Sequence, residues 1–203
     1  MNDVTRRGLV RGLLISAGLI VAGAIGWIVY RPAPPADPAA SYAAAVGGPF
    51  TLTGTDGRPF GSDRLRGKPF AIFFGFTRCP DVCPTTLSRM ARLRAQLGAD
   101  GGRFNIVFVS VDPESDTPEQ IGRYLTLFDT PIVGLTGTPQ QLDAVKRAYA
   151  VYAQRVPLEG GGYTMDHTAS VFLMGRSGEF VTTLDAHEDE TTSLAKLRRL
   201  IRS

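Results

Sequence analysis

Cysteine, histidine and tryptophan are scarce in this 203-residue chain, which contains two, two and one of them. So few cysteines exclude a small scaffold held together by many disulfides. Charged residues make up only 20% of the chain and form no basic stripe, so nothing in the sequence favours nucleic-acid binding. Only one apolar run is long enough to cross a bilayer, which excludes a polytopic membrane protein. Hydrophobic residues make up 43%, which excludes a disordered chain and indicates one globular domain with an appendage.

Residues 12–30, GLLISAGLIVAGAIGWIVY, form that apolar run and contain no charged residue. As a helix they would be about 28 Å long, close to the hydrocarbon thickness of a bilayer. Three arginines precede the run, and Trp27 and Tyr30 stand at its far end. This pattern predicts a single transmembrane anchor, with residues 1–11 in the cytoplasm and the remainder of the chain outside. A cleaved signal peptide or a twin-arginine signal is the alternative.

Residues 31–46, RPAPPADPAASYAAAV, predict a semi-rigid linker, because four prolines disfavour a helix. The formal net charge of +3 is largely explained by the segment up to residue 46, which carries four of the 22 basic and two of the 19 acidic residues. The domain that follows, residues 47–203, is therefore almost neutral.

Strand and helix signals alternate along this domain. Continuous apolar runs at 69–76 and 104–111 predict two strands buried on both faces. Thr117 and Thr138 are each followed by proline and, three residues on, by glutamine, which predicts two capped helices. The other expected strands are 50–53, 132–135, 151–156, 168–174 and 179–184, and the other expected helices begin at Pro84 and at about Thr191. This order predicts an α/β, thioredoxin-like fold in which helices flank a mixed central sheet.

Both cysteines lie in the segment CPDVCP, as Cys79 and Cys83, between a predicted strand and a predicted helix. The helix N-terminus offers free N–H groups that stabilise thiolates, and Arg78 adds a neighbouring cation. A purely structural disulfide closing so small a loop would stabilise the fold little, which favours a functional pair. The pair alone is consistent with a redox dithiol or with soft ligands for Cu(I) or zinc.

His167 is the candidate third ligand. It is expected at the end of a glycine-rich loop, immediately before a strand, and a thioredoxin-like fold packs this loop beside the cysteines. Gly160, Gly161 and Gly162 precede it, so we expect His167 to move with the loop when a metal binds or leaves. The other histidine, His187, stands in an acidic stretch and is predicted to be solvated.

Two aspartates near these residues have two interpretations each. Asp112, which precedes a proline after a predicted strand, either orients a metal ligand without itself binding the metal or caps the following turn. Asp166 either forms a hydrogen bond with His167 or bonds within its own loop. Neither is predicted to be a ligand.

Three stretches together resemble the Sco/SenC family: FGFTRCPDVCP at 74–84, VSVDPESDT at 109–117, and Asp166-His167-Thr168. With the family-like stretch at 134–138 they span essentially the whole domain. The resemblance implies a thioredoxin-like fold and a metallochaperone rather than an enzyme. It also implies that Cys79, Cys83 and His167 bind one copper ion, Cu(I) or Cu(II), and that the two cysteines can form a disulfide.

Members of that family are membrane-tethered copper chaperones that help to assemble the dinuclear copper centre of cytochrome c oxidase subunit II. The resemblance therefore implies three partners, namely subunit II, a copper donor protein and a thiol reductant. The expected location is the cell inner membrane, crossed once, with the domain facing the periplasm.

Three other functions use the same residues. A thiol–disulfide reductase needs the dithiol but neither His167 nor a metal. A peroxidase would need a reactive cysteine and a resolving thiol, both of which are available. A zinc site of two cysteines and one histidine would leave an open position without an evident substrate pocket.

Overall fold

The computed structural model describes residues 19–21, 23–28, 30 and 45–202 and divides into two compact units, Met1–Asp37 and Pro38–Ser203. In the first unit, residues 19–21 and 23–28 are helical. Among the described residues, no helix is both long and apolar enough to cross a membrane. The rest of the predicted span 12–30, and the predicted linker 31–46 apart from its last two residues, lie outside the described residues. The anchor and the linker stay predictions.

The second unit is described over residues 45–202. Its strands are β1 (Thr51–Gly54), β2 (Pro59–Gly61), β3 (Phe70–Gly75), β4 (Asn105–Ser110), β5 (Val133–Thr136), β6 (Ala153–Pro157), β7 (Tyr163–His167), β8 (Val171–Met174) and β9 (Phe180–Leu184). Its α-helices are α3 (Val82–Gln96), α4 (Pro118–Leu125), α5 (Pro139–Ala148) and α6 (Glu190–Arg202), with short 3-10 helices at Ser62–Leu65 and Gly98–Arg103.

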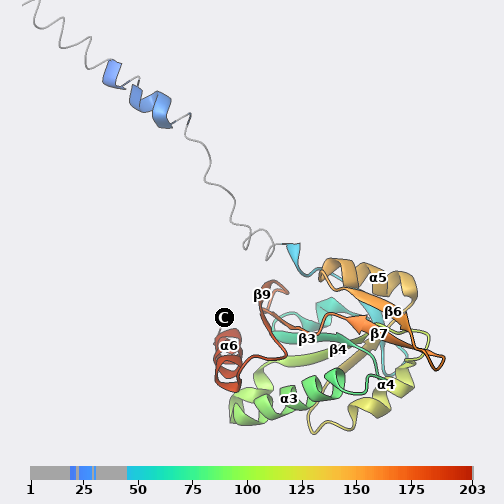
Figure 1. Ribbon diagram of the computed structural model, residues 1–203. Coiled ribbons are helices and arrows are strands. Elements are labelled where there is room, and N and C mark those ends of the chain that lie inside the picture. The colour runs from blue at the N-terminus through green and yellow to red at the C-terminus, as the bar shows by residue number, and fades with distance from the viewer. Residues whose placement is uncertain (1–18, 22, 29, 31–44, 203) are drawn as a thin grey trace, which may run out of the picture. The chain divides into compact units, whose positions relative to one another are not determined.

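Seven of these strands form one sheet in the order β2-β1-β5-β4-β3-β8-β9. The central strands β3, β4 and β5 run parallel, and the outer strands join antiparallel. Figure 1 shows α5 on one side of this sheet and α3 and α4 on the other. The mixed sheet flanked by helices confirms the predicted fold class.

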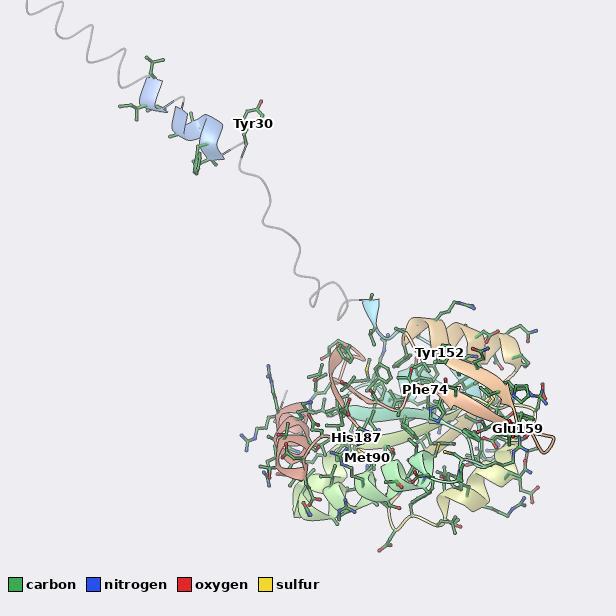
Figure 2. The ribbon with its side chains drawn as sticks, in the orientation of Figure 1. Tyr30, Phe74, Met90, Tyr152, Glu159 and His187 are labelled. Atoms are coloured by element: carbon green, nitrogen blue, oxygen red, sulfur yellow. The ribbon has the colours of Figure 1, made fainter. Side chains whose placement is uncertain are left out.

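Strand β3 lies at the centre of the core, and all six of its residues are buried. Its side chains alternate between the two faces of the sheet. Phe73 packs against Phe108 of β4, with ring centroids 6.3 Å apart, whereas Phe74, labelled in Figure 2, packs against Tyr149 just beyond α5 at 5.5 Å. Burial on both faces is what its continuous apolar sequence predicts.

Both predicted capping boxes are present. The Thr117 hydroxyl accepts a hydrogen bond from the backbone N–H of Gln120, and the Gln120 side-chain oxygen accepts one from the N–H of Thr117. Thr138 and Gln141 do the same at α5. Local sequence therefore fixes the beginnings of α4 and α5.

Three expectations about local structure were wrong. Helix α3 begins at Val82 rather than at Pro84, so Cys83 lies inside its first turn. The segment Pro59–Gly61, which is absent from the expected strands, is strand β2 and pairs with β1. His167 does not lie on a loop: it ends strand β7, which pairs with β6 in a separate two-stranded sheet. Its partner β6 was predicted, at 151–156 rather than at Ala153–Pro157. Strand β7 was not predicted, because none of its five residues is fully buried and it lacks the apolar run that marks the central strands.

Candidate metal centre

The two cysteines occupy different environments at the start of α3. Cys79 lies in the turn after β3 and is partly exposed, whereas Cys83 in the first turn of α3 is fully buried. The backbone N–H of Cys83 lies 3.4 Å from the sulfur of Cys79 and donates a hydrogen bond to it. The free N–H at the helix start therefore stabilises the sulfur of Cys79, not that of Cys83 itself.

His167 approaches Cys83 from the end of β7. Its Nε2 lies 3.5 Å from the Cys83 sulfur, and its Nδ1 lies 3.0 Å from the carbonyl oxygen of Thr168. Since a carbonyl only accepts hydrogen bonds, this contact assigns a proton to Nδ1 and leaves Nε2, which faces the sulfur, as the nitrogen available to bind a metal. A neutral imidazole with a free Nε2 is the form that binds metals.

Two aromatic rings hold the imidazole from the sheet side. The ring of Phe73 lies 6.0 Å from that of His167, and the ring of Phe76 lies 5.8 Å away with its plane almost perpendicular. These edge-on contacts restrict the ring orientation without using its nitrogens.

The ligand atoms of Cys79, Cys83 and His167 all lie within 4.8 Å of one another. Donor atoms about 2.0–2.3 Å from one ion lie at most about 4.6 Å apart, so small shifts are enough to close this site around a metal. In the described part of the chain, no other cluster of three cysteine, histidine or acidic side chains converges in this way. The three residues named from the sequence are brought together, and two sulfurs with one imidazole form a donor set suited to soft metal ions.

Burial decides the protonation of Cys83. Removal from water raises the pKa of its thiol well above the ordinary value, and the nearby Cys79 raises it further, although a backbone hydrogen bond from Phe76 opposes this. The expectation that the helix N-terminus would favour a thiolate here was therefore wrong for Cys83. In the metal-free protein Cys83 is a neutral thiol, whose proton a bound cation would displace.

The site is open to the outside on one side. On this side the site opens into a surface depression of about 240 Å³, whose lining includes Phe76, Cys79, Val82, Met165 and His167. The side chain of Val82 is 38% exposed at this place. A metal held by the three ligands would therefore lie next to the surface, within reach of another molecule.

Asp116 supports the cysteine turn, and the sequence interpretation missed it. Its side chain is 1% exposed, and its carboxylate accepts three hydrogen bonds: from the Thr77 N–H at 3.0 Å, the Thr77 hydroxyl at 2.6 Å and the Ser110 hydroxyl at 2.6 Å. Thr77 stands two residues before Cys79, so this buried carboxylate fixes the turn that carries the first ligand. Its position four residues after Asp112 gives no local sign of that role.

Asp112 neither contacts a ligand nor acts only as a turn cap. It is buried, accepts a hydrogen bond from Arg78 at 3.0 Å, and accepts another from the Tyr163 hydroxyl at 2.9 Å. The Arg78 guanidinium is therefore bound to Asp112, and the hydrogen bond raises its pKa. Arg78, expected to add a cation next to Cys79, thus directs its guanidinium to Asp112.

The remaining expectations concern Asp166 and His187. Asp166 is exposed, and the Nδ1 of His167 lies against the Thr168 carbonyl, so of the two interpretations of Asp166 the structure does not support a hydrogen bond with His167. His187 is exposed in the segment between β9 and α6, as predicted.

Comparison with known proteins assigns this chain to a family. The model of the SCO1/SenC family matches residues 38–202. This chain belongs to the SCO1/SenC family. The mitochondrial protein SCO2 of Saccharomyces cerevisiae is 37% identical over 162 residues, which cover 78% of this chain and 54% of that protein.

Solved structures agree with this assignment. A copper-bound structure of ScoI from Bradyrhizobium japonicum is 44% identical, covers 77% of this chain and 99% of its own, and superposes with a TM-score of 0.70. Copper-bound yeast Sco1 is 34% identical, with 78% and 90% coverage and a TM-score of 0.71. This chain spans about half the length of the mitochondrial SCO1/SenC relatives named first in the curated comparison.

Proposed function

We propose that this protein is a membrane-anchored copper chaperone that binds one copper ion through Cys79, Cys83 and His167 and delivers it to the dinuclear copper centre of cytochrome c oxidase subunit II. The observation that carries the proposal is the convergence of the three ligand atoms within 4.8 Å at a site open to the surface.

The donor set supports copper over harder metals. Two sulfurs and one imidazole suit Cu(I) and also accommodate Cu(II), whereas magnesium and calcium prefer oxygen ligands. The Bradyrhizobium and yeast relatives were both solved with copper bound. Zinc would accept the same ligands, so the metal has to be tested directly.

The three ligands differ in ways that suit transfer. Cys79 is partly exposed and would meet an approaching thiol first, whereas Cys83 is buried and loses its proton only when the metal binds. His167 comes from a separate two-stranded sheet, so it can withdraw without disturbing the central sheet. Stepwise exchange of these ligands for those of a partner would move the ion without releasing it into water.

Location and anchoring belong to the same proposal. The uncharged run 12–30, preceded by arginines, supports a single inner-membrane anchor with the domain in the periplasm. This arrangement would keep the domain beside a membrane-bound oxidase. A copper donor and a thiol reductant complete the proposed set of partners.

A thiol–disulfide reductase is the second candidate, favoured by the pair of free cysteines. In that reaction the Cys79 thiolate attacks a disulfide in the oxidase copper site, and Cys83 then resolves the mixed disulfide. Two electrons and two protons pass to the target, which becomes a dithiol, while Cys79 and Cys83 become a disulfide. A thiol reductant must then restore this protein.

One experiment separates the two candidates. The reduced, copper-loaded full chain in mild detergent is mixed with metal-free, reduced subunit II, and formation of its copper centre is followed by visible absorption. In parallel, the copper-free chain is mixed with subunit II whose two copper-site cysteines are oxidised, and new thiols are counted. The chaperone predicts that His167→Ala abolishes the first reaction. If the wild type does not form the copper centre in the first reaction, while the second is abolished by cysteine substitutions and unchanged by His167→Ala, the protein is a reductase.

A further inference from the structure

The β6–β7 hairpin that carries His167 forms a sheet of its own. Within residues 45–202, β7 pairs only with β6, and neither strand joins the seven-stranded sheet. Tyr163 begins β7 and His167 ends it. Because side chains of a strand alternate, Tyr163, Met165 and His167 point to the same side. Met165 packs against the core, but an apolar contact gives no fixed direction.

Tyr163 makes the directional contacts at its end of the strand. Its hydroxyl lies 2.9 Å from one carboxylate oxygen of Asp112, which is buried, and 2.8 Å from the hydroxyl of Ser115. The guanidinium of Arg78 lies 4.7 Å from the centre of the Tyr163 ring, and that of Arg155 lies 3.5 Å from it. A ring stacked with cations and bonded to a buried carboxylate has little freedom to shift.

The same carboxylate also holds the cysteine turn. The second oxygen of Asp112 accepts the hydrogen bond from Arg78, the residue next to Cys79, at 3.0 Å. Arg78, Asp112 and Tyr163 thus contact one another in a closed triangle. The triangle joins the turn that carries Cys79, the segment after β4, and the strand that carries His167.

We propose that Tyr163 is a positioning residue for His167: through Asp112 and Arg78 its hydroxyl keeps β7 where the imidazole meets the two cysteines. For copper binding, this inference rests on the proposed function. A site whose third ligand is in place for only a fraction of the time binds its metal more weakly by that fraction. Loss of the hydroxyl therefore weakens copper binding without removing any ligand.

The decisive variant is Tyr163→Phe, which removes the hydroxyl and keeps the ring over the two cations. Tyr152→Phe is the matched control, because Tyr152 immediately precedes β6 and, among the described residues, its hydroxyl bonds to Gln154 within the hairpin. Copper affinity of the full chain in mild detergent is measured by competition with a chelator of known affinity, in the wild-type and in the His167→Ala background.

The expected pattern is specific for an action through His167. Tyr163→Phe weakens copper binding about tenfold in the wild-type background, but less than about twofold when His167 is already alanine. Tyr152→Phe changes affinity less than about twofold in either background. A loss below about threefold in the wild-type background, or an equal loss in both backgrounds, would overturn the inference.

A second readout needs no metal. The chain has only two histidines, so the imidazole proton signals of His167 and His187 are easily told apart by NMR. Phe73 and Phe76 pack edge-on around His167 and displace its signals by their ring currents, whereas His187 is exposed. In metal-free Tyr163→Phe, the His167 signals should move toward those of His187. If they stay in place, the inference is wrong whether or not copper binds. If the wild-type chain binds no copper but the His167 signals do shift in Tyr163→Phe, only the proposed function is refuted.

Discussion

Replacement of Asp116 tests how the cysteine turn is held. The carboxylate is 1% exposed and accepts three hydrogen bonds, two from Thr77 and one from Ser110. Hydrogen bonds to a charged group contribute about 1.5–3 kcal/mol each, and they are not additive. In Asp116→Ala the hydroxyls of Thr77 and Ser110 can turn to other partners, but the partly buried Thr77 N–H is fixed by the backbone and cannot. We therefore expect a loss of about 3–5 kcal/mol of unfolding free energy.

Asp116→Asn should cost much less, about 1–2 kcal/mol. Its amide oxygen can still accept from the Thr77 N–H, and its NH₂ group can donate to the Thr77 hydroxyl, which accepts as well as donates. The control is Asp100→Ala, which breaks an exposed ion pair with Arg103. Such a pair contributes little, so this variant should lose less than about 0.5 kcal/mol.

The measurement is denaturant unfolding of the reduced, metal-free full chain, followed by circular dichroism. Tryptophan fluorescence is unsuitable because the only tryptophan, Trp27, precedes the domain. The midpoint should fall in the order wild type, Asn, Ala, with Asp100→Ala at the wild-type position. An alanine variant as stable as the asparagine variant would refute the reasoning, because the unpaired backbone N–H would then cost nothing.

Three further predictions concern the site and its surroundings. In the metal-free protein, one equivalent of iodoacetamide at neutral pH should label Cys79 before Cys83, because burial raises the pKa of the Cys83 thiol. Peptide mass spectrometry measures the ratio of labelled Cys79 to labelled Cys83, and equal labelling would contradict a neutral Cys83 thiol. Gly75→Ala should destabilise the fold by about 2–3 kcal/mol and weaken copper binding, because the new methyl group would lie 2.7 Å from the Cys83 sulfur. If the denaturation midpoint and the copper affinity are both unchanged, helix α3 can move away from the methyl group and the prediction is wrong. Hydrogen bonds from the Ser177 hydroxyl and backbone N–H lower the pKa of Glu179, so the ionised carboxylate adds stability at pH values above about 4, and this stability is lost as the pH falls further. Glu179→Gln should therefore be less stable than wild type at pH 7 and nearly equal to it at pH 3. A difference in stability that does not change with pH would contradict this sign.

The parts of the fold that follow from local sequence were predictable. The positions of Thr117 and Thr138 predict the starts of two helices, because a capping box is a local contact within four residues. The buried run at 69–76 announces β3, because a strand covered on both faces must be apolar throughout. Cys79 and Cys83 were found because they are the only cysteines of the chain, whereas His167 was assigned as the third ligand through the resemblance of Asp166-His167-Thr168 to the Sco/SenC family.

The residues that hold the ligands in place were not predictable. Asp116 bonds to Thr77, 39 residues earlier, and Tyr163 bonds to Asp112, 51 residues earlier. Nothing near either residue in the sequence indicates its partner, because the partner is defined only when β3, β4 and β7 have assembled. Strand β7 was missed because it is short, contains no fully buried residue and, within the described residues, pairs only with β6, outside the seven-stranded sheet.

Copper titration of the reduced, metal-free full chain tests the central claim most directly. We expect one copper ion per chain, with binding abolished by Cys79→Ser or Cys83→Ser and strongly weakened by His167→Ala. His187→Ala is the matched control, because it removes the other histidine, which is exposed and outside the cluster of ligands, and it should leave the affinity unchanged. If the wild type fails to bind copper, or if His167→Ala binds as tightly as His187→Ala, the three-ligand copper site is refuted.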